Sequence, residues 1–185
     1  MKAGILALQG DFREHAEMFS ACGATPFFVR TPEDLAAVDC LAIPGGESTT
    51  IGKLATRYEL VAPIRARVDQ GMPVFGTCAG MIVMAERVEG GTPLLSVLDI
   101  DVRRNAYGRQ VDSFETDIDV KGVGPVRGVF IRAPVVKEVG RGVDVLAEHE
   151  GTPVVVQHGN LLAASFHPEM AGDARLHERL LDLVR

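Results

Sequence analysis

Hydrophobic runs alternate with amphipathic segments over the first half of the chain. Four apolar runs are short enough to be buried strands: residues 3–8, 25–30, 39–46 and 72–76. Helical patterns lie between them, as in residues 11–22, which end at Gly23, and in a longer stretch that continues to Gly71. Another helix is expected to open at Thr31 and Pro32, since threonine caps helices well and proline suits the first helical position. This alternation predicts a parallel sheet covered by helices.

The second half of the chain has a different rhythm, with polar and apolar residues alternating in steps of two. The alternating runs cover residues 97–104, 114–120, 126–132 and 143–150. A hairpin is expected at residues 152–166, because a Gly-Asn pair inside it marks a tight turn. A final helix is expected from Gly172 to Val184. The whole pattern predicts one three-layer α/β domain over residues 1–185, with a mixed, mostly parallel sheet flanked by helices.

The composition describes an ordinary, slightly acidic globular protein. Hydrophobic residues make up 46% of the 185 residues and the formal net charge is -6, which speaks against binding to nucleic acid. The N-terminal stretch holds only a short apolar run, whereas a membrane span needs about 20 apolar residues. Three cysteines without a C-x-x-C pair fit neither a disulfide framework nor a zinc ribbon. We therefore expect a reduced, cytoplasmic protein with no membrane partner.

The sequence Gly-Thr-Cys-Ala-Gly at residues 76–80 lies where the fourth apolar run meets a helical pattern. Gly76 and Gly80 flank Cys78 at the spacing of a nucleophile elbow, in which glycines allow a sharp bend and leave room for substrate. At the start of a helix, the positive end of the dipole would favour a thiolate. The same pattern also fits a buried cysteine that only packs, which is how we interpret Cys22 and Cys40.

A base for this cysteine is sought among five histidines. His167 ends an apolar run in the sequence Ser-Phe-His-Pro-Glu, and Pro168 biases the residue before it towards an extended conformation. In an extended segment His167 and Glu169 project to the same side, so that the carboxylate can orient the imidazole. By itself, His-Pro-Glu also fits a surface turn.

The other histidines have weaker settings, and solvated or capping roles are expected for all of them. They are His15, His149, His158 and His177.

Acyl transfer also needs donors for a developing oxyanion. The backbone N–H of Ala79, directly after the cysteine, is one natural donor. A second can come from Gly46 in the Pro-Gly-Gly-Glu-Ser-Thr stretch at residues 44–49. The same loop could instead hold phosphate, but it lacks the pattern of a P-loop and no dinucleotide-binding glycine motif follows a strand.

The cysteine elbow, the Pro-Gly-Gly loop and the C-terminal His-x-Glu resemble, in that order, the triad (class I) glutamine amidotransferases. Within that family the chain is similar to the glutaminase subunits of pyridoxal 5'-phosphate synthases. The stretches that carry the resemblance are residues 6–15, 44–50, 76–81, 104–115, 129–134 and 165–169. The first, second and fourth are the most specific to these subunits.

The resemblance implies a role for each matching residue. Cys78 would be the nucleophile, His167 the base and Glu169 the residue that orients it. The glutamine site would be lined by Gly46, Glu47, Ser48, Arg104, Ile131 and Arg132. Arginine suits the α-carboxylate of glutamine and a carboxylate suits its α-ammonium, although the sequence leaves open which group each residue holds. Without the resemblance, Arg104 and Arg132 would be interpreted as surface charges.

The resemblance also implies partners. L-Glutamine would be hydrolysed to L-glutamate and ammonia without any metal or organic cofactor. The ammonia would pass to a synthase subunit in a large hetero-oligomer, and the free glutaminase would be nearly inactive. Gln9, which follows the first strand, would couple the site to that partner.

Three alternatives remain open from the sequence. The chain could be a glutaminase subunit of another pathway, such as histidine or purine synthesis, which should lack the stretch at 104–115. It could be a cysteine hydrolase or peptidase of related topology, with different substrate loops. It could also be a scaffold that binds a partner without catalysis.

Overall fold

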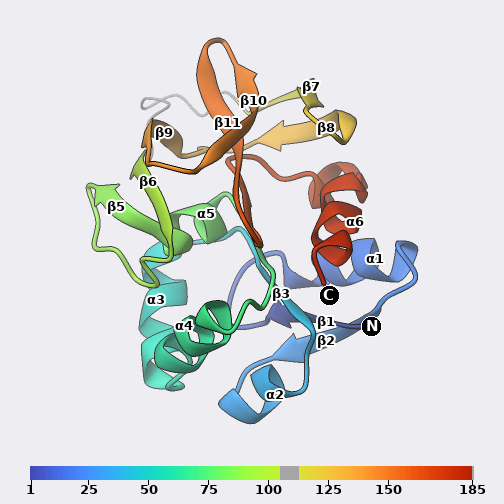
Figure 1. Ribbon diagram of the computed structural model, residues 1–185, viewed down its shortest axis with the longest axis vertical. Helices are drawn as coiled ribbons and strands as arrows, with labels where there is room; N and C mark the ends of the chain where they lie inside the picture. The colour runs from blue at the N-terminus through green and yellow to red at the C-terminus, as the bar shows by residue number, and fades with distance from the viewer. Residues whose placement is uncertain (105–112, 185) are drawn as a thin grey trace.

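The computed structural model describes residues 1–104 and 113–184, and a seven-stranded sheet forms its centre (Figure 1). The strands of this sheet are β1 (Lys2–Leu6), β2 (Thr25–Val29), β3 (Cys40–Ile43), β4 (Val74–Thr77), β10 (Asp144–His149), β11 (Thr152–His158) and β12 (Leu161–Ala164). Their order is β10-β11-β12-β4-β3-β1-β2. The strands from β12 to β2 run parallel, and β10, β11 and β12 pair antiparallel. The predicted mixed, mostly parallel sheet is confirmed.

Two smaller sheets extend the domain beyond the central one. A three-stranded sheet contains β5 (Ala85–Glu89), β6 (Leu98–Arg103) and β9 (Val135–Val139), and a two-stranded sheet contains β7 (Phe114–Val120) and β8 (Gly124–Phe130). The sequence pattern predicted β6, β7 and β8 but missed β5 and β9. Each of these two strands buries a single residue, so their patterns lack regular alternation.

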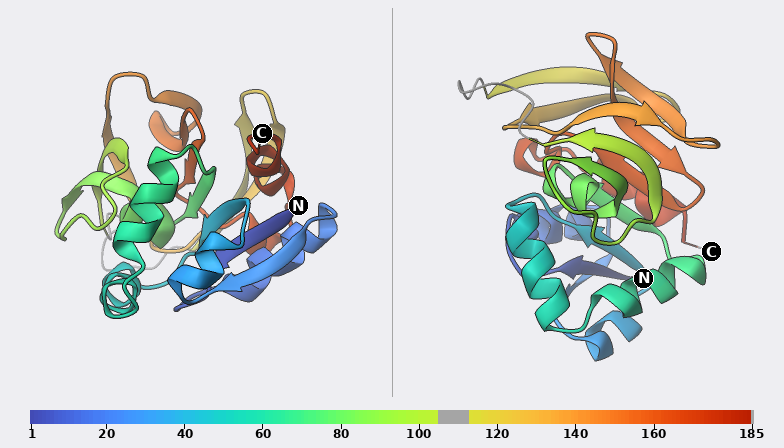
Figure 2. Two further views of the ribbon diagram at one scale, coloured as in Figure 1. Left: turned by 60° about the horizontal axis from the view of Figure 1, so that its bottom comes forward. Right: turned by 90° about the vertical axis from the view of Figure 1, so that its left-hand side faces the viewer.

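Helices cover both faces of the central sheet. On one face lie α1 (Phe12–Ala21) and α6 (Arg175–Asp182), and on the other α2 (Pro32–Ala36), α3 (Ser48–Arg57), α4 (Val61–Asp69) and α5 (Ala79–Met84). Figure 2 shows these layers from two further directions. A single turn of 3-10 helix, η1 (Glu169–Ala171), precedes α6.

Because both faces of the sheet are covered, β3 and β12 are apolar at every position, and β4 has a polar residue only at its end, Thr77. In β3, Leu41 and Ile43 point to the core beneath α3, α4 and α5, whereas Cys40 and Ala42 point to the core beneath α1 and α6. The expectation that Cys40 is a core residue is confirmed. Cys22 is only partly buried.

Some helix boundaries differ from those expected. The helical stretch up to Gly71 is two helices, because Glu59 adopts a left-handed backbone conformation (φ 57°) between α3 and α4. The helix expected from Gly172 to Val184 is shorter, since Gly172 is itself left-handed and ends the 3-10 turn. The predicted cap is confirmed: the Thr31 side chain accepts the backbone N–H of Asp34.

The helix that follows Cys78 packs closely against the sheet at Gly80. A Cβ atom added to Gly80 would overlap the backbone carbonyl of Ile43 in β3. Gly52, in α3, has room by contrast, since a Cβ there would lie 3.6 Å from the nearest carbon of Leu94. The same substitution should therefore have opposite effects at these two positions.

We expect Gly80→Ala to destabilise the protein by about 1–3 kcal/mol or more, because the extra methyl group forces α5 away from β3. Gly52→Ala should stabilise it by up to about 1 kcal/mol, because alanine favours the helix and the site has space. Urea unfolding of both variants measures the difference. Equal stability of the two variants would contradict the close packing of α5 on β3.

Candidate functional site

The candidate site lies at the carboxyl ends of four neighbouring parallel strands, β12, β4, β3 and β1. This is the edge at which open α/β sheets bind ligands. Cys78 follows β4, the loop at Gly45 and Gly46 follows β3, Gln9 follows β1 and His167 follows β12. The segment after β8 reaches the same place, because Val129 and His167 form an isolated antiparallel bridge. Strand order thus brings residues from both halves of the chain together.

A cavity of about 390 Å³ opens at this edge. Ten of the residues predicted from the sequence line it: Gln9, Gly46, Glu47, Ser48, Cys78, Ala79, Arg104, Ile131, Arg132 and His167. Glu169, the remaining predicted residue, is buried behind His167. Asp11, Gly45, Ile82 and Met170 complete the lining.

Cys78, one of the residues that line this cavity, adopts a strained backbone conformation. Its φ is 49° and its ψ is -104°, and its N–H donates to the Ala164 carbonyl oxygen over 2.9 Å. The Sγ atom lies 3.9 Å from the Ile131 carbonyl oxygen, and the residue is 7% exposed. We expected Gly76 and Gly80 to supply the bend, but neither has a positive φ. The bend is in Cys78 itself, and the glycines provide space for close packing.

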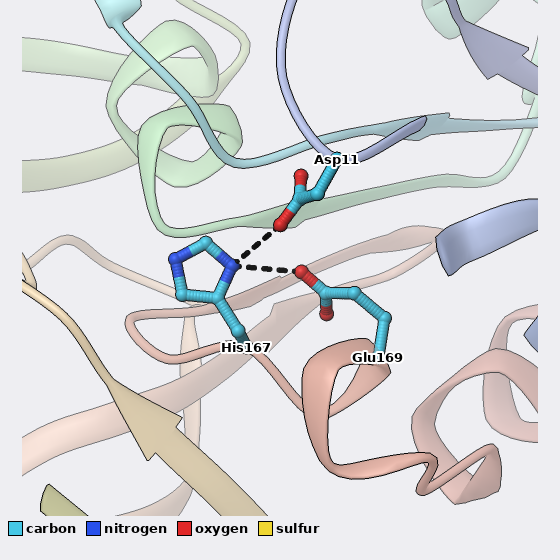
Figure 3. A group of neighbouring side chains, drawn as sticks. All are labelled: Asp11, His167 and Glu169. Atoms are coloured by element: carbon cyan, nitrogen blue, oxygen red, sulfur yellow. Dashed lines mark hydrogen bonds and ion pairs between the residues drawn. The ribbon is translucent and has the colours of Figure 1, made fainter. Parts of the chain in front are cut away.

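The imidazole of His167 is hydrogen-bonded to Cys78. Two carboxylates, those of Asp11 and Glu169, both point at one nitrogen of its ring (Figure 3). Its Nδ1 lies 2.8 Å from Oε1 of Glu169 and 2.8 Å from Oδ2 of Asp11. The ring also packs against Gly45, where a Cβ atom would overlap it. Backbone, ring and carboxylates together fix the orientation of the imidazole.

The contact between His167 and Glu169 was predicted, but the stated reason was wrong. Glu169 does not continue an extended segment, since Pro168 has helical dihedral angles (φ -68°, ψ -32°) and Glu169 begins η1. Glutamate has a side chain long enough to reach back from this turn to Nδ1. The turn also buries Glu169, which is 3% exposed.

These charges set the protonation of the cluster. Burial alone would lower the pKa of His167, but hydrogen bonds with Asp11, Cys78 and Glu169 raise that pKa to about 12. Burial would raise the pKa of Glu169, but His15 and His167 hold it well below its usual value. Burial raises the pKa of Asp11, and the nearby charge of Glu169 adds to the effect. At neutral pH, His167 is therefore an imidazolium beside an ionised Glu169.

Asp11 is a site residue that the sequence analysis missed. It is the residue before α1 and shares the single Nδ1 proton of His167 with Glu169. Its position in the chain indicated this role, because the loop between a buried parallel strand and the next helix, here β1 and α1, lies at the ligand edge.

The expectation for two histidines was wrong as well. His15 and His177 are fully buried, not solvated. The helical pattern indicated that His15 is buried, since Met18 and Phe19 follow it by three and four residues and lie on the same buried face of α1. Of the other two, His158 is exposed and His149 is partly buried.

The glycine loop is tied to the loop after β1 by a side chain. Gln9 Oε1 accepts the backbone N–H of Glu47 over 2.8 Å, and Gly46 has a φ of 144°, a conformation that suits only glycine. A Cβ on Gly46 would come within 2.6 Å of the same Gln9 oxygen. Gln9 therefore fixes the conformation of the Gly46–Glu47 peptide.

Glu47 caps α3 and pairs with an arginine at the cavity wall. Its carboxylate accepts the backbone N–H groups of Thr49 and Thr50, and Arg104 Nη2 lies 3.0 Å from Oε1. Slight burial opposes ionisation, but the hydrogen bonds from Thr50 and Thr49 lower the pKa of Glu47 to about 2. A permanently charged carboxylate and a guanidinium thus face the same cavity. Arg132 adds a second guanidinium on a left-handed backbone (φ 45°).

A larger hollow of about 560 Å³ adjoins this cavity and shares Ser48, Ile82 and Arg104 with it. Its described lining has no cysteine, histidine or carboxylate. Cys78 and His167 line the smaller cavity, which we therefore take as the candidate site.

Asp11, His167 and Glu169 are also the kind of residues that bind metal ions. Both carboxylate oxygens, however, lie 2.8 Å from Nδ1, whereas ligands of a tetrahedral zinc site would be about 3.3 Å apart. The distances fit a shared proton better than a shared ion.

Among the residues that the structure describes, no helix is long and apolar enough to cross a membrane.

Comparisons with known proteins agree with this geometry. Residues 5–184 match the SNO glutamine amidotransferase family. A protein of Streptomyces avermitilis named pyridoxal 5'-phosphate synthase subunit PdxT is 56% identical over 187 residues, which cover 98% of this chain and 93% of that protein. A protein of the same name from Niallia circulans is 52% identical, with 100% and 98% covered.

Solved structures give the same result. A crystal structure described as a glutamine amidotransferase superposes with a TM-score of 0.94 at 51% identity and covers 98% of both chains. A putative GMP synthase subunit from Thermoplasma acidophilum has a TM-score of 0.70 at 13% identity, covers 100% of this chain and 94% of its own, and shares the fold alone. Most of the sequence stretch at 104–115 lies outside the described residues.

The buried His177 predicts a pH dependence of stability. Burial, helped by the nearby His15, lowers the pKa of His177 from 6.5 to about 3, so the unfolded chain binds a proton at higher pH than the folded one. The stability that neutral His177 contributes is therefore present above pH 6.5 and lost as the pH falls towards 3. His177→Gln, which keeps an N–H donor but does not titrate, should lose less stability over this range. Thermal unfolding at several pH values measures how steeply the stability of the wild type and of His177→Gln depends on pH.

The control is His158→Gln, at an exposed position. Its slope should equal that of the wild type. Parallel curves for wild type and His177→Gln would contradict a neutral, buried His177.

Proposed function

The chain belongs to the SNO glutamine amidotransferase family, and from that premise we propose that it hydrolyses L-glutamine to L-glutamate and ammonia with Cys78, His167 and Glu169 as its triad. The observation that carries the proposal is the strained Cys78 beside a His167 whose Nδ1 lies 2.8 Å from Glu169. A cysteine that only packs would not need this backbone strain or a charged imidazole beside it.

The reaction begins when the Cys78 thiolate attacks the carbonyl carbon of the glutamine side chain. The tetrahedral intermediate collapses as its C–N bond breaks, and His167 donates a proton to the leaving ammonia. The thioester that remains is attacked by water, from which the now neutral His167 takes a proton. The second tetrahedral intermediate collapses as its C–S bond breaks, which restores the Cys78 thiolate beside a protonated His167. The new carboxylic acid gives its proton to the released ammonia, so that glutamate leaves and the proton count balances. No step requires a metal or an organic cofactor.

The oxyanion of both intermediates needs donors in the cavity. The backbone N–H groups of Ala79 and Gly46 are the proposed pair, supported by the presence of both residues in the lining of the cavity that contains Cys78. The proposed glutamine-binding residues are Gly46, Glu47, Ser48, Arg104, Ile131 and Arg132. Their charges suit an amino acid, since the arginines can bind its carboxylate and Glu47 its ammonium group.

The partner follows from the relatives. Two relatives that are more than half identical to this chain are named pyridoxal 5'-phosphate synthase subunits. We propose that this chain is likewise the glutaminase subunit of such a synthase, that it works in the cytoplasm as one domain over residues 1–185, and that it passes ammonia to a synthase subunit within a large hetero-oligomer. Ammonia released into water would be protonated and diluted, so a direct route to the partner is needed.

The alternatives raised by the sequence fit less well. A peptidase would need a long open groove, whereas the reactive groups here lie in a cavity with two arginines and a glutamate. A scaffold without catalysis would have no use for a His167 held by two carboxylates.

We expect glutamate release from glutamine by the purified protein to rise strongly when a synthase subunit from the same organism is added. Cys78→Ala should abolish the release with and without the partner, because no nucleophile remains. A coupled glutamate dehydrogenase assay measures it. Activity that survives in Cys78→Ala would contradict the proposed nucleophile, and full activity without the partner would contradict the proposed gating.

Gln9→Ala should lose the stimulation by the partner, because the substitution frees the Gly46–Glu47 peptide that Gln9 holds. Alkylation of Cys78 by iodoacetamide should continue in this variant, since the triad is untouched. Mass spectrometry of the Cys78 peptide and the glutamate assay give the two readings. Unchanged stimulation would remove Gln9 from the coupling.

A further inference from the structure

Three buried polar side chains extend the triad into the core. His15 from α1, His177 from α6 and Thr77 at the end of β4 are each 0% exposed. His15 Nδ1 lies 2.8 Å from His177 Nε2, and His15 Nε2 lies 3.1 Å from Thr77 Oγ1. Thr77 Oγ1 in turn lies 3.2 Å from Oε1 of Glu169. These side chains form an unbroken chain of contacts from α6 to the carboxylate that holds His167.

The direction of the hydrogen bonds follows from proton accounting. His177 is neutral, since burial lowers its pKa to about 3, so it carries one ring proton. Its Nδ1 has no partner among the described residues. A buried donor is costlier to leave unpaired than a buried lone pair, which places the proton on Nε2 of His177. This N–H then donates to Nδ1 of His15.

The direction of this first hydrogen bond determines the directions of the next two. With its Nδ1 accepting, His15 carries its proton on Nε2 and donates it to Thr77 Oγ1. The Thr77 hydroxyl is then free to donate to Oε1 of Glu169. The same Nε2 of His15 lies 3.5 Å from Oε1 and adds an attraction from its N–H dipole. Every proton in the chain of contacts is directed towards one carboxylate oxygen.

Glu169 needs this support because it is deeply buried. Burial alone would raise its pKa, yet its pKa lies well below the usual value, and His15 contributes to the lowering before His167 does. Among the described residues, the ionisable side chains close to Glu169 are Asp11, His15 and His167, and His177 lies behind His15. Asp11 competes with Glu169 for the Nδ1 proton of His167. If Glu169 lost its donors, Asp11 would become the main acceptor of that proton.

We propose that His15 is a positioning residue for the proposed glutaminase reaction: through Thr77 it keeps Glu169 ionised and directed at Nδ1 of His167, while His177 fixes the tautomer of His15. The inference rests on the proposed function for its catalytic consequence. The hydrogen-bond chain itself does not depend on it.

The tautomers can be observed directly in the full-length protein without any activity. Long-range ¹H–¹⁵N correlation spectra at pH 7 should show both His15 and His177 protonated at Nε2 alone. A His15 protonated at Nδ1, or at both nitrogens, would overturn the proposed direction of the chain of hydrogen bonds.

The catalytic consequence is tested in the complex with the synthase subunit. His15→Phe removes the donor but keeps a ring of similar size, and should lower kcat on the order of tenfold to a hundredfold with little change in KM. In the profile of kcat against pH, the acid limb of this variant should move to higher pH, because Glu169 then takes up a proton more easily. His15→Gln, whose amide reaches the position of Nε2, should recover most of kcat and restore the profile.

His158→Gln, at an exposed position, is the matched control and should behave as wild type. A pH profile unchanged in His15→Phe, or a loss of kcat that His15→Gln does not recover, would overturn the proposal. If the wild-type complex releases no glutamate, the proposed function fails, and the spectra still decide the tautomers.

Discussion

The strained backbone of Cys78 is the constraint on which the site depends. A non-glycine residue at φ 49° and ψ -104° costs about 1–3 kcal/mol and persists only where its surroundings hold it. They do so on both sides: the Cys78 N–H is bound to β12, and Gly80 is packed against the carbonyl of Ile43 in β3. The cysteine is therefore clamped between two neighbours of β4 and cannot relax into the helix that follows it.

The same edge of the sheet also holds charged side chains that are largely buried from water. An imidazolium and two carboxylates occupy a place where each charge alone would be costly. They are tolerated because they share protons, and because Thr77 and His15 supply donors from inside the core. Helices α1 and α6 thus provide more than apolar cover for this face of the sheet.

Much of the fold and of the site could be predicted from the sequence, because both depend on local patterns. The apolar runs gave the parallel strands, and the glycine spacing around Cys78 gave the elbow. The carboxylate of Glu169 was found for the wrong reason, since a two-residue spacing cannot tell an extended segment from a 3-10 turn with a long side chain.

What was missed depends on contacts between distant parts of the chain. Asp11 meets His167 across 156 residues, and His15 meets His177 across 162. A histidine in a helical pattern shows its burial only through neighbours such as Phe19, and it shows its partner only once the helices are placed. Strands β5 and β9 were missed because their exposed residues leave no alternation to detect.

The position of β12 in the middle of the sheet also governs how the protein can be made. This strand pairs with β4 on one side and with β11 on the other, although 83 residues separate Thr77 from Leu161 in the sequence. A growing chain therefore carries an unpaired edge on β4, beside a cysteine without its base, until residues 161–169 have left the ribosome. The order of synthesis therefore delays the assembly of the reactive thiol with its base. During that interval the unpaired edge of β4 is exposed to aggregation and needs protection.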